Sequence, residues 1–316
     1  MFDSVPRTIL NTDSGEINLA EPTAPISTIG VLGAGTMGHG IAQMAAVAGF
    51  EVFLRDVDDA SLARGMQAIE RNLDKGVQLG KVAAEDREQA LAHIHPTVEL
   101  RDLSAADLII EAAPEKLDLK QSLLRESEDL TALHCIWASN TSSLSITEIA
   151  RAATRPQNVI GMHFFNPVHI MRLVEIVVGG QTGQATVDAV RALARSMKKE
   201  PIVVRDVPGF ASSRLGVTLG LEAMRMVEQG VASARDIDTA MELGYNHPMG
   251  PLRLTDLVGL DVRLSIAEYL HSKLGSEAFR PPEILRRMVS QGKLGKKSGE
   301  GFYKWNDHEA SQKAYT

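Results

Sequence analysis

Two residues near the middle of the chain, His163 and Glu175, have side chains that could perform acid–base chemistry. His163 lies near the end of an apolar run, in Gly-Met-His-Phe-Phe-Asn-Pro, and Glu175 interrupts the next run, Leu-Val-Glu-Ile-Val-Val. A carboxylate inside such a run is costly to bury without a partner, and an imidazole is a natural one. A histidine oriented by a carboxylate is a competent general base for a hydroxyl proton. The spacing alone fits a buried structural contact as readily as a catalytic pair.

A second polar stretch, Asn140-Thr-Ser-Ser-Leu, follows the apolar run Cys135-Ile-Trp-Ala. If both runs are strands of one parallel sheet, the two polar stretches lie at the carboxyl ends of their strands. Open parallel sheets bind their ligands at that edge. We therefore expect both stretches to contribute to a site there.

A glycine-rich loop near the start of the chain could bind a ligand as well. The apolar run at 29–32 leads into Gly33-Ala-Gly35-Thr36-Met37-Gly38. In a dinucleotide-binding unit such glycines make a tight turn, admit the pyrophosphate and let a helix pack closely, while the first amides of the helix hold the phosphates. The same pattern also closes ordinary turns, but here a helical pattern and a second apolar run at 52–54 follow it.

The second apolar run leads to Asp56, about 20 residues beyond Gly35, where a carboxylate can bond both ribose hydroxyls of adenosine. A carboxylate at this place repels a 2′-phosphate, so Asp56 favours NAD over NADP as the cofactor. The neighbouring Arg55 argues in the other direction, because an arginine could accommodate that phosphate.

The elements that position these groups alternate along the first two thirds of the chain. Short apolar runs predict strands, and apolar residues at intervals of three or four predict helices. We expect strands at 29–32, 52–54, 107–111, 135–138, 159–165, 173–178 and 202–204, and helices at 41–48, 62–77, 117–130 and 184–198. This alternation predicts a doubly wound α/β domain with a Rossmann-type sheet, over residues 26–207.

Beyond Pro208 only helical patterns remain, at 210–228, 234–243, 252–274 and 282–291, and they predict a smaller all-α domain over 208–316. Residues 1–25 are polar, contain three prolines and show no period. We expect them to form an extension outside the fold that is mobile unless docked. Lys75 and Lys81, on the long helix, lie outside its apolar face. Charged residues in such positions usually do no more than face the solvent.

Composition excludes several classes of protein. A chain of 316 residues suits two domains, and its net charge of −7 argues against a general nucleic-acid or anionic-membrane binder. Cys135 is the only cysteine, so the chain has no disulfide framework and no cysteine cluster for a metal. No apolar run reaches membrane-spanning length. We expect a cytoplasmic protein without a bound metal.

From about 27 to 303 the sequence resembles the L-3-hydroxyacyl-CoA dehydrogenases, the 3-hydroxybutyryl-CoA dehydrogenases among them. The shared motifs, in order, are Gly-Ala-Gly-Thr-Met-Gly, Ala-Ser-Asn-Thr-Ser-Ser-Leu, Gly-Met-His-Phe-Phe-Asn-Pro, Leu-Val-Glu, Pro-Gly-Phe, Pro-Met-Gly-Pro-Leu and Gly-Lys-Lys-Ser-Gly-Glu-Gly-Phe-Tyr. The resemblance implies reversible oxidation of an L-3-hydroxyacyl-CoA, of short chain such as 3-hydroxybutyryl-CoA, with NAD, as in fatty acid β-oxidation. It also implies a homodimer formed through the helical domain.

The resemblance assigns roles to single residues. His163 matches the family's catalytic base, Glu175 the glutamate that orients it, and Ser142 the serine that hydrogen-bonds the substrate. The predicted cofactor site includes the glycine-rich loop, with Thr36 and Met37, and Asp56. It also contains Glu115, Lys120, Asn140, Asn166 and Lys297. The phosphates of CoA would meet Lys75 or Lys81 on the long helix. His169 and His247 match no family motif and are predicted to be loop residues.

One position departs from the family pattern. After Pro-Gly-Phe the family usually has an asparagine before an arginine, and its side chain assists at the substrate oxygen. Here Ser213 precedes Arg214. A serine keeps one donor but has a shorter reach and no amide group. Either Ser213 assists Ser142 at the oxygen, or it only packs at the start of its helix and Ser142 makes the contact alone.

Two other functions stay open on the sequence. A related dehydrogenase of a free hydroxy acid, such as the L-gulonate enzyme, shares this architecture but does not need the CoA moiety. A non-catalytic NAD-binding or structural relative is the second alternative, and the intact His163 and Glu175 argue against it.

Overall fold

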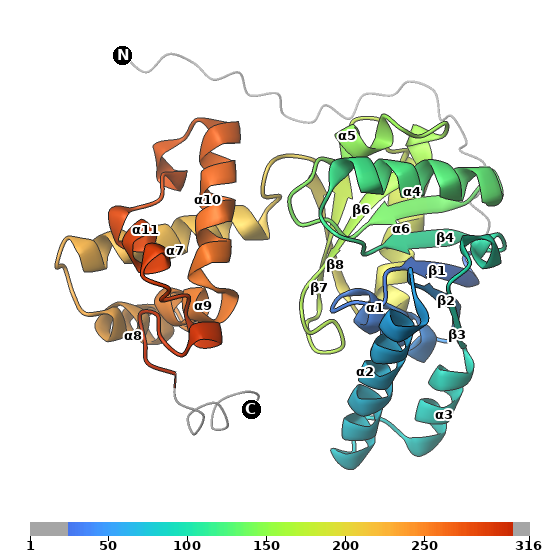
Figure 1. Ribbon diagram of the computed structural model, residues 1–316, viewed down its shortest axis with the longest axis horizontal. Helices are drawn as coiled ribbons and strands as arrows, with labels where there is room; N and C mark the ends of the chain where they lie inside the picture. Colours follow the sequence, from blue (N-terminus) through green and yellow to red (C-terminus); the bar gives the residue numbers. More distant parts are fainter. Residues whose placement is uncertain (1–24, 306–316) are drawn as a thin grey trace.

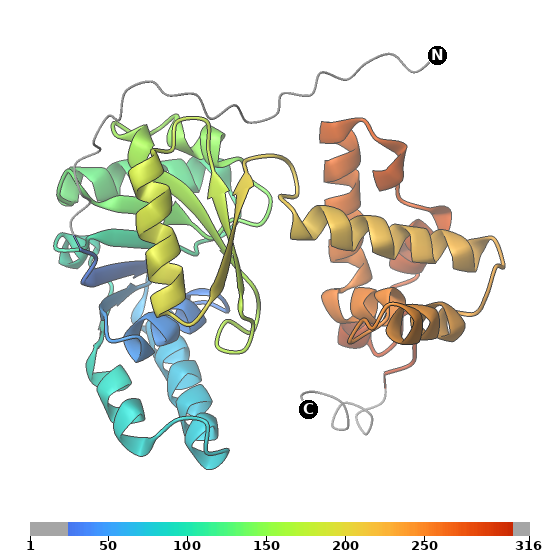
Figure 2. The same ribbon diagram turned by 180° about the vertical axis from the view of Figure 1, so that it is seen from behind.

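The computed structural model describes residues 25–305, so the predicted N-terminal extension lies, except for its last residue, outside the described range. Figures 1 and 2 show two bodies joined by one crossing of the chain. We call the first the sheet domain, with strands β1 to β8 and helices α1 to α6, and the second the helical domain, from α7 to η4.

The sheet domain contains eight strands in the order β3-β2-β1-β4-β5-β6-β7-β8. Their bounds are β1 Thr28–Leu32, β2 Glu51–Arg55, β3 Ile94–Thr97, β4 Leu108–Glu111, β5 Ile136–Ser139, β6 Val159–Phe164, β7 Leu173–Val178 and β8 Glu200–Arg205. Strands β1 to β6 are parallel, whereas β7 runs antiparallel to β6 and parallel to β8. The strand order reverses between β1 and β4, which creates the crevice where doubly wound sheets bind ligands.

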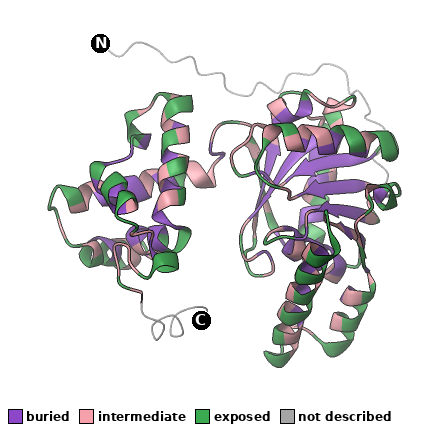
Figure 3. Cartoon of the chain, in the orientation of Figure 1, coloured by how far each residue is buried: buried purple, intermediate pink, exposed green. Residues whose placement is uncertain are grey.

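Helices cover both faces of this sheet, because alternate residues of each strand point to opposite sides. The helices are α1 Gly38–Val47, α2 Asp59–Gln78, α3 Ala84–Ala92, α4 Leu117–Leu130, α5 Ile146–Ala150 and α6 Gln184–Ser196, with the short η1 Leu100–Leu103 and η2 Pro156–Asn158. Ile29 and Val31 share a core with α1, α2 and α6, and Leu32 shares a second core with α4 and α5. Figure 1 shows α4 in front of the sheet, Figure 2, seen from the opposite side, shows α6 in front of it, and Figure 3 shows most of the strands coloured as buried.

The helical domain has a core of its own, which includes Leu221, Leu252 and Leu270. Its elements are α7 Ser212–Glu228, α8 Ala234–Gly244, α9 Pro251–Val258, α10 Leu260–Leu274, η3 Glu277–Phe279, α11 Glu283–Ser290 and η4 Lys296–Ser298. The carboxylate of Asp256 on α9 accepts hydrogen bonds from the backbone amide of Tyr303 and the indole of Trp305, at 2.9 and 2.8 Å. This contact ties the last described residues to the domain.

The predicted α/β sheet followed by helices is confirmed, with small differences at element ends, and the helical pattern over 252–274 is divided into two helices. Gly259 has φ of 103° and separates α9 from α10. Only glycine adopts that conformation readily. The sequence also predicts neither α3, which buries only Ala90, nor β3, an edge strand that contains Pro96. None of the helices in residues 25–305 has the length and apolar content needed to cross a membrane.

Candidate active site

His163 and Glu175 face each other across neighbouring antiparallel strands. They are paired in the register of β6 and β7, and Nδ1 of the imidazole lies 2.8 Å from Oε2 of the carboxylate. Their exposed fractions are 8% and 0%. Because a carboxylate only accepts, Nδ1 donates the proton of this bond and Nε2 keeps its lone pair. That tautomer can accept a proton from a substrate hydroxyl.

The carboxylate of Glu175 also binds the start of α7. Its Oε1 accepts from the backbone amides of Ala211 and Ser212, at 3.1 and 2.8 Å, and its Oε2 accepts from the Ser212 hydroxyl at 2.8 Å. The helix has no cap from its own N-cap side chain, so this carboxylate satisfies amides that would otherwise be unpaired, at the positive end of the helix dipole.

Burial raises the pKa of Glu175, but the hydrogen bonds from His163 and Ser212 outweigh it, so the pKa lies below its usual range. The carboxylate is therefore ionised at neutral pH and can hold the imidazole in one orientation. Ser212 is a residue that the sequence did not single out. The available signal was a hydroxyl in the first turn of a predicted helix, directly before Ser213.

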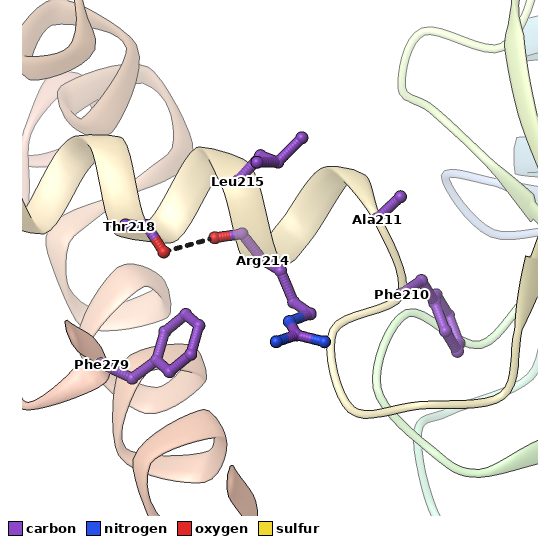
Figure 4. A pocket seen from close by; sticks show the side chains of 6 residues that line it. All are labelled: Phe210, Ala211, Arg214, Leu215, Thr218 and Phe279. Carbon is purple, nitrogen blue, oxygen red and sulfur yellow. Dashed lines mark hydrogen bonds between the residues drawn. The ribbon is translucent and has the colours of Figure 1, made fainter. Parts of the chain in front are cut away.

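Aromatic rings and a pocket lie beside the imidazole. The ring centroid of His163 is 4.6 Å from that of Phe165 and 5.8 Å from that of Phe210. Beyond Phe210 a pocket of about 390 Å³ follows one face of α7, lined by Phe210, Ala211, Arg214, Leu215, Thr218 and Phe279. Figure 4 shows the Arg214 side chain pointing away from α7, into the space between Phe279 and Phe210. Ser213 forms no side-chain hydrogen bond within the described range.

The loop after β5, which contains Ser142, is organised by Glu115. One oxygen of this carboxylate, Oε1, accepts from the Thr141 hydroxyl at 2.6 Å and from the amides of Ser142 and Ser143, both at 3.1 Å. Burial raises the pKa of Glu115, yet the bonds from Thr141 and Ser143 and the charge of Lys120 hold it below its usual range. Among residues 25–305 no group bonds the hydroxyl of Ser142, whereas the backbone amide of the same residue is held by Glu115.

Lys120 supports this loop from within the sheet domain. Its ammonium lies 2.7 and 2.9 Å from the two oxygens of Glu111 and 3.3 Å from Oε2 of Glu115. Lys120 is 1% exposed, and Ser139 also donates to Glu111, at 2.6 Å. The ammonium is enclosed by the carboxylates of Glu111 and Glu115, and the contact of Lys120 with NAD stays a prediction.

The glycine-rich loop has the geometry that a dinucleotide needs. A Cβ on Gly38 would lie 1.7 Å from the carbonyl oxygen of Gly33, so only glycine lets α1 start this close to β1. A Cβ on Gly35 would meet nothing within 4 Å, which leaves its backbone open to an approaching phosphate. Beside the loop lies a pocket of about 230 Å³, lined by Ala34, Gly35, Thr36, His39, Asp56, Ser61, Arg64 and Gly65.

Asp56 lines that pocket, whereas Arg55 does not. The Asp56 carboxylate accepts from the amides of Ala34 and Val57, both at 2.7 Å, which fixes it beside the loop. Arg55 points to the neighbouring edge, where Nε donates to the carbonyl oxygen of Val98 at 3.2 Å. The arginine that lines the pocket is Arg64, held by the Ser61 hydroxyl at 2.8 Å. Arg64, and not Arg55, is therefore the arginine placed to accommodate a 2′-phosphate beside Asp56.

Two residues fix the loops around His163. Oδ1 of Asn140 accepts from the backbone amide of Phe164 at 2.9 Å, so the loop after β5 is tied to the end of β6. Lys199 is buried, and its ammonium donates to the carbonyl oxygens of Val168 and Met171 in the loop that contains Asn166. Burial lowers the pKa of Lys199 to about 8.

Three other predicted ligands are lysines outside these contacts. Lys297 is in η4 of the helical domain, where its ammonium lies 2.7 Å from Oδ2 of Asp261. Lys75 and Lys81 are exposed, on α2 and just after it. His169 and His247 lie in loops, as predicted. In the described part of the chain no group of three histidine, cysteine or acidic side chains could hold a metal ion.

Comparison with known proteins covers nearly all of the described chain. The family model for the NAD binding domain of 3-hydroxyacyl-CoA dehydrogenase matches residues 28–207, and the model for the C-terminal domain matches residues 209–305. The 3-hydroxybutyryl-CoA dehydrogenase of Clostridioides difficile is 42% identical over 278 residues, 88% of this chain and 99% of that one. A crystal structure of (S)-3-hydroxybutyryl-CoA dehydrogenase from Ralstonia eutropha has a TM-score of 0.87 and 42% identity, and the match covers 89% of this chain and 100% of that one.

Proposed function

Because this chain belongs to the 3-hydroxyacyl-CoA dehydrogenase family and takes NAD as its cofactor, we propose that it acts on a short-chain L-3-hydroxyacyl-CoA such as 3-hydroxybutyryl-CoA. The product is the 3-oxoacyl-CoA, and the reaction is reversible. One observation carries the proposal: the buried pair of His163 and Glu175 stands next to the loop of Ser142, at the edge of the sheet where ligands bind.

The residues divide the chemistry between them. Nε2 of His163 accepts the proton of the substrate hydroxyl, and Glu175, 2.8 Å from Nδ1, stabilises the imidazolium that results. Ser142 donates to the substrate oxygen, with Ser213 as a second donor from the first turn of α7. NAD, when bound on the glycine-rich loop, supplies the acceptor for the hydride of C3. Glu115, Asn140 and Asn166 border the nicotinamide end.

The remaining assignments follow the same proposal. The domain division at 207/208 is supported by the two matched segments, and contact of the CoA phosphates with Lys75 or Lys81 is supported by the exposure of Lys75 on α2 and of Lys81 just after it. A homodimer through the helical domain is supported by apolar side chains that face solvent there, such as Leu243 at 83% exposure. The net charge of −7 supports a protein without a nucleic-acid partner.

The test of the proposed function is an NADH-absorbance assay with acetoacetyl-CoA beside free acetoacetate and free gulonate. We expect rapid NADH oxidation with the CoA thioester and slow or no oxidation with the two free acids. Turnover of a free acid at an equal kcat/KM would instead identify a hydroxy-acid dehydrogenase, and no turnover of any of them would identify a non-catalytic relative.

Ser213→Ala is expected to lower kcat more than it raises KM, because a donor to a developing oxyanion acts mainly in the transition state. Loss of such a donor costs about 3–4 kcal/mol where it is fully engaged. Ser213→Asn is expected to retain or raise activity on short acyl-CoA substrates, because it restores the donor usual in the family. If Ser213→Ala leaves kcat and KM unchanged, Ser142 holds the oxygen alone and Ser213 only packs in the first turn of α7.

The enzyme is expected to prefer NADH over NADPH. Asp56→Ala is expected to reduce this preference mainly by lowering kcat/KM for NADH. A hydrogen bond to a charged group contributes about 1.5–3 kcal/mol, so kcat/KM for NADH should fall roughly 10- to 100-fold. Adding Arg64→Ala to Asp56→Ala distinguishes the effects of the two side chains on cofactor preference. The double variant should lose any NADPH activity that Asp56→Ala creates. Equal kcat/KM of the unaltered enzyme for both cofactors would show that Arg64 already overrides Asp56.

A further inference from the structure

The helical domain is hydrogen-bonded to the sheet domain at two places within residues 25–305. At the first, Ala211 and Ser212 at the start of α7 donate to Glu175, the partner of His163. At the second, Tyr269 on α10 donates from its hydroxyl to the backbone carbonyl oxygen of Ser143, at 2.8 Å. The first contact is made to Glu175 itself, and the second is made to Ser143, the residue after Ser142. The proposed mechanism uses both Glu175 and Ser142.

The second contact acts on a loop that is already held from the opposite side. The amides of Ser142 and Ser143 donate to Glu115, which lies against the buried ammonium of Lys120. The carbonyl of Ser143 is the group that accepts from Tyr269. The backbone around Ser142 is thus bound to the sheet domain through its amides and to the helical domain through the next carbonyl.

The surroundings of Tyr269 keep its hydroxyl a donor. The side chain is only partly buried, and burial raises the pKa of the phenol, with the negative charges of Glu148, Asp206 and Glu115 adding to this effect. The phenol therefore stays protonated through neutral and mildly alkaline pH. A carbonyl oxygen has no proton of its own, so the bond depends on this donor.

We propose that Tyr269 is a positioning residue that couples the helical domain to the loop of Ser142, so that the Ser142 hydroxyl is set against the substrate oxygen when the helical domain holds that loop. The inference rests on the proposed function, because it takes Ser142 as the donor to the substrate. Tyr269 itself acts through the backbone of Ser143 and not on the reacting atoms. With Glu175 bound to α7, the same domain then contacts both the base and the oxygen-binding loop.

The test is Tyr269→Phe, which keeps the ring and removes only the hydroxyl. In the acetoacetyl-CoA assay kcat is expected to fall roughly three- to tenfold, the range that one lost hydrogen bond gives, while KM for NADH stays unchanged. Tyr245→Phe is the matched control, since Tyr245 is an exposed tyrosine of the same domain, and it should leave kcat unchanged.

A double-mutant cycle with Ser142→Ala shows whether Tyr269 acts through the Ser142 loop. If it does, Tyr269→Phe should have little further effect on kcat once the Ser142 hydroxyl is absent. Full additivity of the two changes, an unchanged kcat in Tyr269→Phe, or a loss of thermal stability with no change in kcat would each overturn the inference. The unaltered enzyme in the same assay tests the proposed function separately, because its turnover does not depend on the role of Tyr269.

Discussion

His163→Gln is expected to lower kcat by roughly 10²- to 10⁴-fold, the range that general acid–base catalysis contributes. Nδ1 of the imidazole is bonded to Glu175, and Nε2 is the atom proposed to accept the proton of the substrate hydroxyl. The ring can therefore take up that proton while the carboxylate balances its charge. Glutamine can still donate to Glu175, but its amide cannot accept and return a proton near neutral pH. Steady-state turnover of acetoacetyl-CoA with NADH measures the effect.

The control for His163→Gln is the affinity for NADH, measured by titration of the cofactor's fluorescence. The glycine-rich loop and Asp56 are untouched by the change, so the Kd should be nearly the same as in the unaltered enzyme. A variant that retains near-normal turnover would remove His163 from the mechanism, and a large rise in the Kd would instead place it in the cofactor site.

Glu175→Gln is expected to reduce kcat by roughly 10²- to 10⁴-fold, as loss of the orienting carboxylate does in other histidine–carboxylate pairs. Four donors converge on the carboxylate: the imidazole, the amides of Ala211 and Ser212, and the Ser212 hydroxyl. An amide group has only one oxygen, so its NH₂ must face one of these donors. Either the imidazole takes the wrong tautomer or the start of α7 loses its cap.

Acid unfolding provides the independent check on Glu175. Because its pKa in the folded protein is lowered, its ionised form contributes stability above the ordinary carboxyl pKa, and this contribution is lost as pH falls through the lowered value. The thermal midpoint of the unaltered protein should therefore fall more steeply on acidification than that of Glu175→Gln. Parallel pH profiles of the two midpoints would show that the charge of Glu175 does not stabilise the fold.

Much of this site was predictable because its signals are local. The glycine-rich loop and Asp56 follow from a strand–loop–helix pattern, and Glu175 stands out because a carboxylate in a strand of Leu, Val and Ile requires a partner. The pairing with His163 then follows once β6 and β7 are neighbours, since an antiparallel register places the two residues opposite each other.

The rest could not be predicted because it depends on contacts between distant segments. The bond between Ser212 and Glu175 requires the placement of α7 against the sheet domain, and the bond between Thr141 and Glu115 joins residues 26 positions apart in the chain. Adjacent side chains of a strand point to opposite faces, which accounts for Arg55 pointing away from Asp56. That Arg64 lines the Asp56 pocket depends on how α2 packs beside the glycine-rich loop, which no local pattern indicates.

The donors that α7 offers to Glu175 have a consequence for exchanging domains between relatives. Two of the three are backbone amides, at Ala211 and Ser212, and any residue other than proline supplies an amide. A chimera in which a relative's helical domain is joined after Pro208 should therefore keep most of the cap on Glu175, whatever side chains the donor domain brings. Among the bonds to Glu175, the one from the Ser212 hydroxyl is the one that such a graft must import deliberately.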